Sequence, residues 1–153
     1  MIDSIKTAFE KRLNRLDWMD ETTRQAALTK ARAISDMIGY PSFIEDQSEL
    51  NYKYEGLNIH PDDYFGNGMA SRNFAFLENM GKIQKLVNRT KWSMTPPTVN
   101  AYYTPTKNQI VFPAGILQSP FFNVRYPKSI NYGAMGVVMG HELSHAFDDQ
   151  VSQ

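Results

Sequence analysis

The residues best suited to chemistry are two histidines and a glutamate near the C-terminal end of the sequence, His141, Glu142 and His145. On a helix, positions four apart lie on one face about one turn apart, so both imidazoles can reach one metal ion at roughly 2.0–2.1 Å, the Zn–N distance. Glu142 is offset around the helix axis and can face a metal-bound water without binding the metal, as a general base requires. The pattern therefore predicts a zinc hydrolase.

An ordinary helix with two exposed histidines is the alternative interpretation, because the pattern arises by chance in roughly a few chains per thousand. The distribution of histidines favours the metal site, since two of the 3 histidines of the chain belong to this motif. Gly133, Gly136 and Gly140 precede the motif in the same helical run, and together they cost a helix about 3 kcal/mol in propensity. We therefore expect a packing or functional reason for them. With Ser144 they form a face of small residues that would let another backbone approach closely.

Two aspartates, Asp148 and Asp149, follow the second histidine. The metal must lie near the level of Leu143, and Asp149 is roughly 9 Å further along the axis at about 1.5 Å per residue. An aspartate is too short to bridge that distance. We expect instead that one of the two accepts the free ring N–H of His145 and fixes its tautomer. The alternative is a charged helix end that faces water.

The composition is that of an ordered globular protein, with 42% hydrophobic and 12% aromatic residues. The 16 basic and 16 acidic residues balance, which argues against a nucleic-acid partner or a polybasic membrane patch. The absence of cysteine excludes disulfides, thiolate metal sites and cysteine nucleophiles. The start of the sequence lacks the pattern of a signal peptide, and the longest nearly apolar run, 133–140, is too short to cross a bilayer. No targeting or anchoring segment is therefore expected within this sequence.

Hydrophobic periodicity predicts helices in the first part of the chain. Apolar residues recur at helical spacing over 2–16, between the N-cap candidate Asp20 and the stop at Gly39, and over 62–87. The first two helices hold no chemical motif and are expected to be packing surfaces. Residues 42–60 are less regular.

After Pro96 the pattern changes from helical to strand-like, and we place a domain boundary there, between 1–95 and 96–153. Residues 98–103 and 109–112 are rich in β-formers and flank a turn-prone segment, which predicts a β-hairpin. The predicted fold is mainly α with a small β-hairpin, an α+β fold with the zinc helix at its C-terminal end.

Four stretches of the sequence are jointly far more specific than the metal motif. They are Leu16-Asp-Trp-Met-Asp20 through Gly39-Tyr-Pro41, Arg89-Thr-x-Trp-x-Met-Thr-Pro-Pro-Thr-Val-Asn-Ala-Tyr-Tyr103, Asn108-Gln-Ile-Val-Phe-Pro-Ala-Gly-Ile-Leu-Gln118, and Gly140-His-Glu-Leu-Ser-His-Ala-Phe-Asp-Asp149. With them, nearly the whole chain resembles the neprilysin and endothelin-converting-enzyme family of zinc metallopeptidases. The resemblance implies that 1–95 is the C-terminal part of a helical N-terminal domain and that 96–153 is the start of an incomplete catalytic domain.

The resemblance also implies a role for each matched residue. His141 and His145 would bind one Zn²⁺ ion. Glu142 would be the general base that activates the zinc-bound water and passes its proton to the leaving amine. Asn100 and Ala101 would hold the substrate backbone, which agrees with a hairpin whose edge strand pairs with an extended peptide.

Four apolar residues match the family's pocket for the residue after the cleaved bond, and an apolar lining favours large hydrophobic side chains there. They are Ile116, Phe121, Val137 and Val138. An aspartate after the second histidine, Asp148 or Asp149, would support that histidine without touching the ion.

Other parts of the family's machinery do not match anything in this sequence, which ends at Gln153. The third zinc ligand of the family is a Glu in a Glu-x-x-x-Asp motif on a later helix, and a downstream His and Arg steady the tetrahedral intermediate. The family's membrane anchor is likewise not matched by any part of this sequence. We therefore expect a zinc metalloendopeptidase acting on oligopeptides at the cell surface, as a single-pass membrane ectodomain whose anchor this chain does not contain. The alternative is a catalytically inactive truncated fragment, or an interaction module, that lacks the third zinc ligand.

Overall fold

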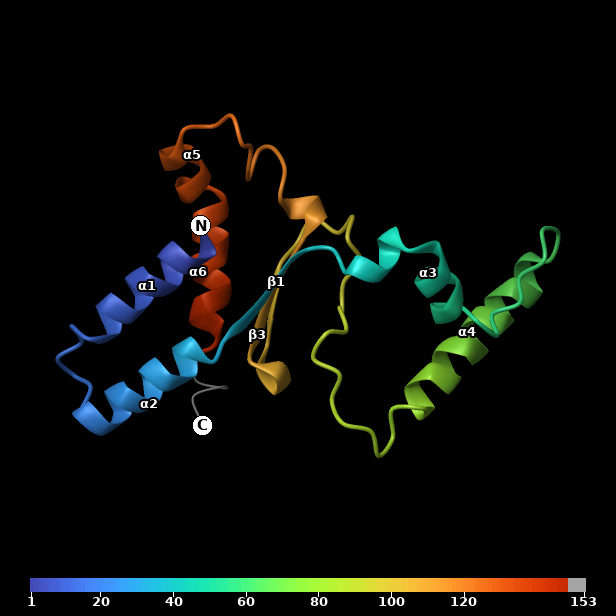
Figure 1. Ribbon diagram of the computed structural model, residues 1–153, viewed down its shortest axis with the longest axis horizontal. Coiled ribbons are helices and arrows are strands. Elements are labelled where there is room, and N and C mark those ends of the chain that lie inside the picture. Colours follow the sequence, from blue (N-terminus) through green and yellow to red (C-terminus); the bar gives the residue numbers. More distant parts are fainter. Residues whose placement is uncertain (149–153) are drawn as a thin grey trace. The chain divides into compact units, whose positions relative to one another are not determined.

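The computed structural model describes residues 1–148 (Figure 1). They fall in two compact units, one formed by 1–40 together with 92–148 and the other by Pro41–Lys91. The first unit contains α1 (Ile2–Leu13), α2 (Glu21–Arg32), β1 (Ser35–Gly39), β2 (Tyr102–Thr104), η2 (Pro105–Lys107), β3 (Gln109–Pro113), η3 (Ala114–Ile116), α5 (Lys128–Gly133) and α6 (Met135–His145). This mixture of helices with a small sheet confirms the predicted α+β class. The first unit contains residues from both sides of Pro96, and the domain boundary predicted there stays a prediction.

The helix α2 begins where the sequence predicts and ends earlier. The Asp20 carboxylate caps it by accepting a hydrogen bond from the Thr23 N–H at 2.8 Å. The prediction that this helix continues to Gly39 is wrong, because Ser35–Gly39 forms strand β1. The Ser35 N–H donates to the Asn108 carbonyl, and β1 pairs along its whole length with β3. Pairing with a distant strand thus outweighs the local helical period.

The sheet of the first unit has the strand order β1-β3-β2. The strands β2 and β3 pair in antiparallel fashion, with Tyr103 opposite Ile110, which confirms the predicted hairpin. The parallel pairing of β1 with β3 places Ser35 opposite Gln109. Every residue of the central strand β3 is buried, so the sheet has its core at this strand.

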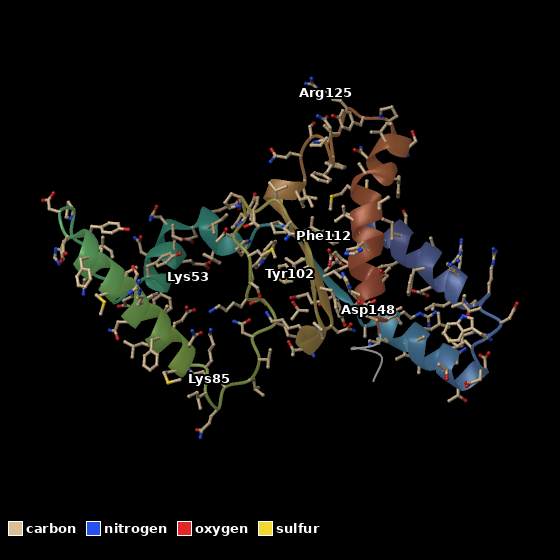
Figure 2. The ribbon with its side chains drawn as sticks, turned by 180° about the vertical axis from the view of Figure 1, so that it is seen from behind. Lys53, Lys85, Tyr102, Phe112, Arg125 and Asp148 are labelled. Carbon is tan, nitrogen blue, oxygen red and sulfur yellow. The ribbon has the colours of Figure 1, made fainter. Side chains whose placement is uncertain are left out.

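One hydrophobic core joins the sheet to the helix α6 and to the start of α1. Phe112 of β3 is completely buried in it (Figure 2). The buried members are Ile2, Ile34, Ala101, Ile110, Phe112, Ile116, Met135, Met139, Leu143 and Ala146. The core therefore holds one face of α6 against the hairpin, which leaves the other faces of this helix for chemistry.

The helical run that leads to the histidine motif is interrupted at Ala134, where the backbone has φ −102° and ψ −83°. The Asn131 side chain accepts from the Asn123 N–H at 3.0 Å and donates to the Asn123 carbonyl at 2.8 Å. The Met135 N–H donates to the Phe121 carbonyl at 3.1 Å. Bonds to the preceding loop thus replace helical bonds at the junction, and α6 starts as a separate helix.

The predicted close approach of another backbone to the glycine face is absent from the described part of the chain. A Cβ placed on Gly133 or Gly140 would meet nothing within 4 Å, and one on Gly136 would touch the Tyr132 ring at 3.4 Å. A close backbone approach occurs instead at Gly115, where a Cβ would lie 2.5 Å from the Pro97 carbonyl oxygen. A side chain at this position would clash with the backbone of Pro97, so only glycine fits there. The approach is held by a hydrogen bond from the Gly115 N–H to the Pro96 carbonyl at 2.8 Å.

The second unit contains η1 (Ser42–Glu45), α3 (Gln47–Lys53) and α4 (Tyr64–Met80). The Asp63 carboxylate caps α4 by accepting from the Gly66 N–H at 2.7 Å. The helix predicted over 62–87 ends earlier, at Met80, and Gly81 follows it. The helix α3 lies within 42–60, a range for which the sequence predicted no regular element. Within residues 1–148, no helix has the length and apolar character needed to span a membrane.

Candidate functional site

The two histidines of α6 lie on one face and point toward each other, as their spacing predicts. Their Nε2 atoms are 2.9 Å apart, and their ring centroids are 4.4 Å apart. His141 is exposed and His145 is half-buried. The two nitrogens therefore converge on one point at the surface of the helix.

This pair of nitrogens fits a zinc ion. Two nitrogen ligands at the usual Zn–N distance of about 2.0–2.1 Å in a tetrahedral site stand roughly 3.3 Å apart, so a small opening of the pair accommodates the metal. In the described part of the chain, no group of three or more His, Cys, Asp or Glu side chains gathers around one point. The described residues thus bring two imidazole nitrogens together at this point, with no third such side chain beside them.

Asp148 supports the second histidine. Its Oδ2 lies 2.6 Å from the Nδ1 of His145, and Figure 2 shows the residue at the C-terminal end of α6. This hydrogen bond is the main reason why the pKa of His145 is raised above its ordinary value. With the Nδ1 proton held by a carboxylate, the Nε2 lone pair is free for a metal. Asp149, the other candidate for this contact, lies outside the described residues.

Glu142 faces the hairpin, because its carboxyl accepts a hydrogen bond from the backbone of Tyr103 in β2. It is 6% exposed, and burial is the main cause that raises the pKa of its carboxyl. Three weaker effects lower that pKa: the charges of His141 and His145, and a hydrogen bond from the backbone of Tyr103. The carboxylate therefore lies between α6 and the edge strand β2, a position in which a general base can reach a peptide held by that strand.

Asn100 and Ala101 lie directly before β2. Asn100 is exposed, Ala101 is buried, and the Ala101 N–H donates to the Asn100 Oδ1 at 2.9 Å. Within residues 1–148, β2 pairs with β3 alone, so it is an edge strand of the sheet. The two predicted substrate-binding residues thus lie at the start of an edge that can accept an extended peptide.

The structure brings three of the four predicted pocket residues together. Ile116 is a buried member of the core, and Phe121 and Val138 are half-buried and packed against it. Val137 is 64% exposed and lies apart from that cluster. Three of the four predicted pocket residues thus share one apolar cluster, and Val137 lies outside it.

Two residues near the site were missed by sequence reasoning. Tyr103 supplies the backbone bond to Glu142, and Asn108 holds the Tyr103 hydroxyl. The signal for Asn108 was present, because asparagine between two strands often adopts the left-handed region, and here its φ is 46°. No pattern in the sequence pointed to Tyr103.

Comparison with known proteins gives a consistent result. The two sequence models described as Peptidase family M13 match residues 1–41 and 100–153. An endothelin-converting enzyme homolog of Locusta migratoria is 61% identical over 98% of this chain, and human endothelin-converting enzyme 1 is 55% identical over the same share. The zinc metalloprotease ZMP1 of Mycobacterium tuberculosis, solved with an inhibitor, has a TM-score of 0.88 at 41% identity and covers 99% of this chain. The chain spans about a fifth of the length of these proteins, 21%, 20% and 22% respectively.

Proposed function

This chain belongs to peptidase family M13, which includes the neprilysins and endothelin-converting enzymes, and on that premise we propose that the protein is a zinc-dependent endopeptidase acting on oligopeptides. One observation supports the proposal most strongly. The histidine pair of α6 converges on one point, while the buried Glu142 of the same helix turns toward the edge strand β2. Metal ligands, a base and a peptide-binding edge are thus adjacent.

His141 and His145 hold the zinc in this proposal, with Asp148 orienting the His145 ring. By the family resemblance, the third ligand would be the glutamate of a Glu-x-x-x-Asp motif, which this sequence does not contain. When bound, zinc supplies Lewis acidity that polarises the scissile carbonyl and lowers the pKa of water. The chemistry requires neutral imidazoles, and the Asp148 contact at Nδ1 leaves the Nε2 atom of His145 as the ligand.

Glu142 moves the proton. Its carboxylate takes a proton from the attacking water and delivers it to the nitrogen of the leaving amine, with no covalent bond to the protein. Burial supports this role, because a carboxyl whose pKa is raised is a stronger base than an ordinary surface carboxylate.

Peptide binding falls to Asn100, Ala101 and the edge strand β2. Main-chain bonds to such an edge hold a peptide regardless of its side chains. The apolar residues Ile116, Phe121 and Val138, with Val137 at their margin, favour a large hydrophobic side chain after the cleaved bond. The relatives named endothelin-converting enzymes support a peptide substrate. We further propose, from the family resemblance, that the protein acts at the cell surface as a membrane-anchored ectoenzyme.

The first test removes the metal from the full-length protein. Exhaustive chelation is expected to abolish cleavage of a reporter peptide, and one equivalent of Zn²⁺ per protein is expected to restore it. A parallel sample treated with calcium-saturated chelator controls for non-specific inhibition. Cleavage that persists after the zinc content has fallen to zero by metal analysis contradicts the proposal.

The second candidate function concerns the isolated 153-residue chain, which would be a catalytically inactive fragment. Its described residues bring together two zinc ligands, whereas catalytic zinc sites use about three from the protein. We therefore propose that the isolated chain binds zinc weakly and does not turn over peptide. If the purified 153-residue chain bound zinc tightly at one equivalent and also cleaved peptide, this proposal would be ruled out.

Asp148 offers a separate test of the ligand arrangement. Replacing Asp148 by alanine removes the partner of the His145 Nδ1 and is expected to weaken zinc binding by roughly 10–100-fold. Competition with a chromogenic chelator measures the affinity. Asp148→Asn, which keeps an acceptor oxygen, is expected to lose less, and Asp17→Ala, an exposed aspartate outside α6, should bind zinc as the parent does. Equal affinity in Asp148→Ala and Asp17→Ala would exclude the supporting role.

A further inference from the structure

Asn108 links three secondary-structure elements of the first unit. It follows η2 and has φ 46° and ψ 57°, in the left-handed region. Its Nδ2 donates to the Lys30 carbonyl of α2 at 3.3 Å, and its own carbonyl accepts from the Ser35 N–H of β1 at 3.1 Å. Its Oδ1 accepts from the Tyr103 hydroxyl of β2 at 3.0 Å. One side chain thus ties the hairpin to the α2–β1 connection.

Tyr103 connects this junction to the catalytic carboxylate. Its side chain is half-buried and packs against the hydrophobic core, with its hydroxyl on Asn108. Its backbone forms a hydrogen bond with Glu142. A displacement of Tyr103 therefore displaces β2 relative to the base on α6, and the Asn108 bond opposes such a displacement.

We propose that Asn108 is a positioning residue for peptide hydrolysis, which holds β2 through the Tyr103 hydroxyl at the correct distance from Glu142. The inference rests on the proposed function, because it concerns the geometry between the base and the bound peptide. Reaction rates depend steeply on such geometry, and a misplacement of about 1 Å can cost on the order of 100-fold.

Two variants of the full-length protein separate the side-chain bond from the backbone conformation. Asn108→Gly keeps the left-handed conformation but loses both side-chain bonds. Tyr103→Phe removes only the hydroxyl and keeps the ring in the core, so it carries the test even if Asn108→Gly folds poorly. We expect each variant to keep its zinc, to lower kcat by about 10–100-fold and to change KM little. Tyr126→Phe, which loses a hydroxyl bonded to Ser119 in a loop, is the matched control with the parent's kcat.

Because both single changes break the same bond, the double variant should be no slower than the slower single variant. A purely structural role would instead reduce zinc content and raise KM along with the loss of kcat. An unchanged kcat in Tyr103→Phe overturns the inference, as does an additive double variant.

Hydrogen exchange provides a readout that does not depend on catalysis. The Tyr103 amide is expected to exchange faster in both variants than in the parent and in Tyr126→Phe, because β2 is held less firmly against Glu142. Unchanged exchange overturns the inference. A parent protein that cleaves no peptide contradicts the proposed function instead, and the exchange measurement still decides whether Asn108 positions β2.

Discussion

Replacing Glu142 by glutamine in the full-length protein is expected to abolish peptide cleavage while zinc stays bound. The amide has nearly the same shape as the carboxylate and can still accept a hydrogen bond from the Tyr103 backbone. It cannot take a proton from water, and the loss of a general base typically costs 10²–10⁴-fold, about 3–5 kcal/mol in the barrier. The measurement is kcat/KM on a reporter peptide, with the zinc content determined in the same sample.

Two further variants sharpen this result. Glu142→Asp keeps a base but withdraws it by one methylene, so its activity is expected to lie between those of the parent and Glu142→Gln. Glu55→Gln, an exposed glutamate in the second unit, controls for the loss of one negative charge. Cleavage by Glu142→Gln at the rate of Glu55→Gln would refute the role given to Glu142.

Replacing Phe112 by alanine is expected to lower the free energy of unfolding by about 3–5 kcal/mol. Phe112 is completely buried in the central strand β3, where it packs in the same core as Met135, Met139 and Leu143 of α6. Removing the ring leaves a cavity between the sheet and the helix that bears the histidines, and packed interiors relax only partly around such a cavity. Denaturant unfolding followed by tryptophan fluorescence and circular dichroism measures the loss.

The controls for this variant differ in the volume removed and in burial. Phe112→Leu removes less volume and is expected to cost clearly less than the alanine variant. Val124→Ala changes a side chain that is 85% exposed and is expected to change the free energy of unfolding by less than about 0.5 kcal/mol. Similar losses for Phe112→Ala and Val124→Ala would show that the sheet does not rely on this core.

The sequence predicted the elements whose signals are local. The His141 and His145 spacing predicted a shared helix face, and their nitrogens do converge. Asp20 predicted the start of α2, and the β-formers around the turn predicted the hairpin. Each of these depends on residues only a few positions apart, which is the range that propensity and periodicity describe.

The features that the sequence did not predict depend on distant partners. Strand β1 forms because β3 pairs with it, although its residues continue the helical spacing of α2. The break at Ala134 depends on bonds from Asn131 and Met135 to the preceding loop. The burial of Glu142 depends on β2 lying over α6. None of these contacts has a local signature, so sequence reasoning had no means of finding them.

The parallel pairing of β1 with β3 has a consequence for how the protein is made. Ser35 and Gln109 lie 74 positions apart, and the second unit is synthesised between them. At the usual elongation rate of about 5–20 residues per second, β1 leaves the ribosome roughly 4–15 s before its partner strand. During that interval the backbone N–H and C=O groups along the edge of β1 have no partner strand. Because a long loop must close before β1 and β3 can pair, formation of the sheet is slow. The sheet, and with it the packing of α6 against β3, is therefore completed only after the second unit has been synthesised.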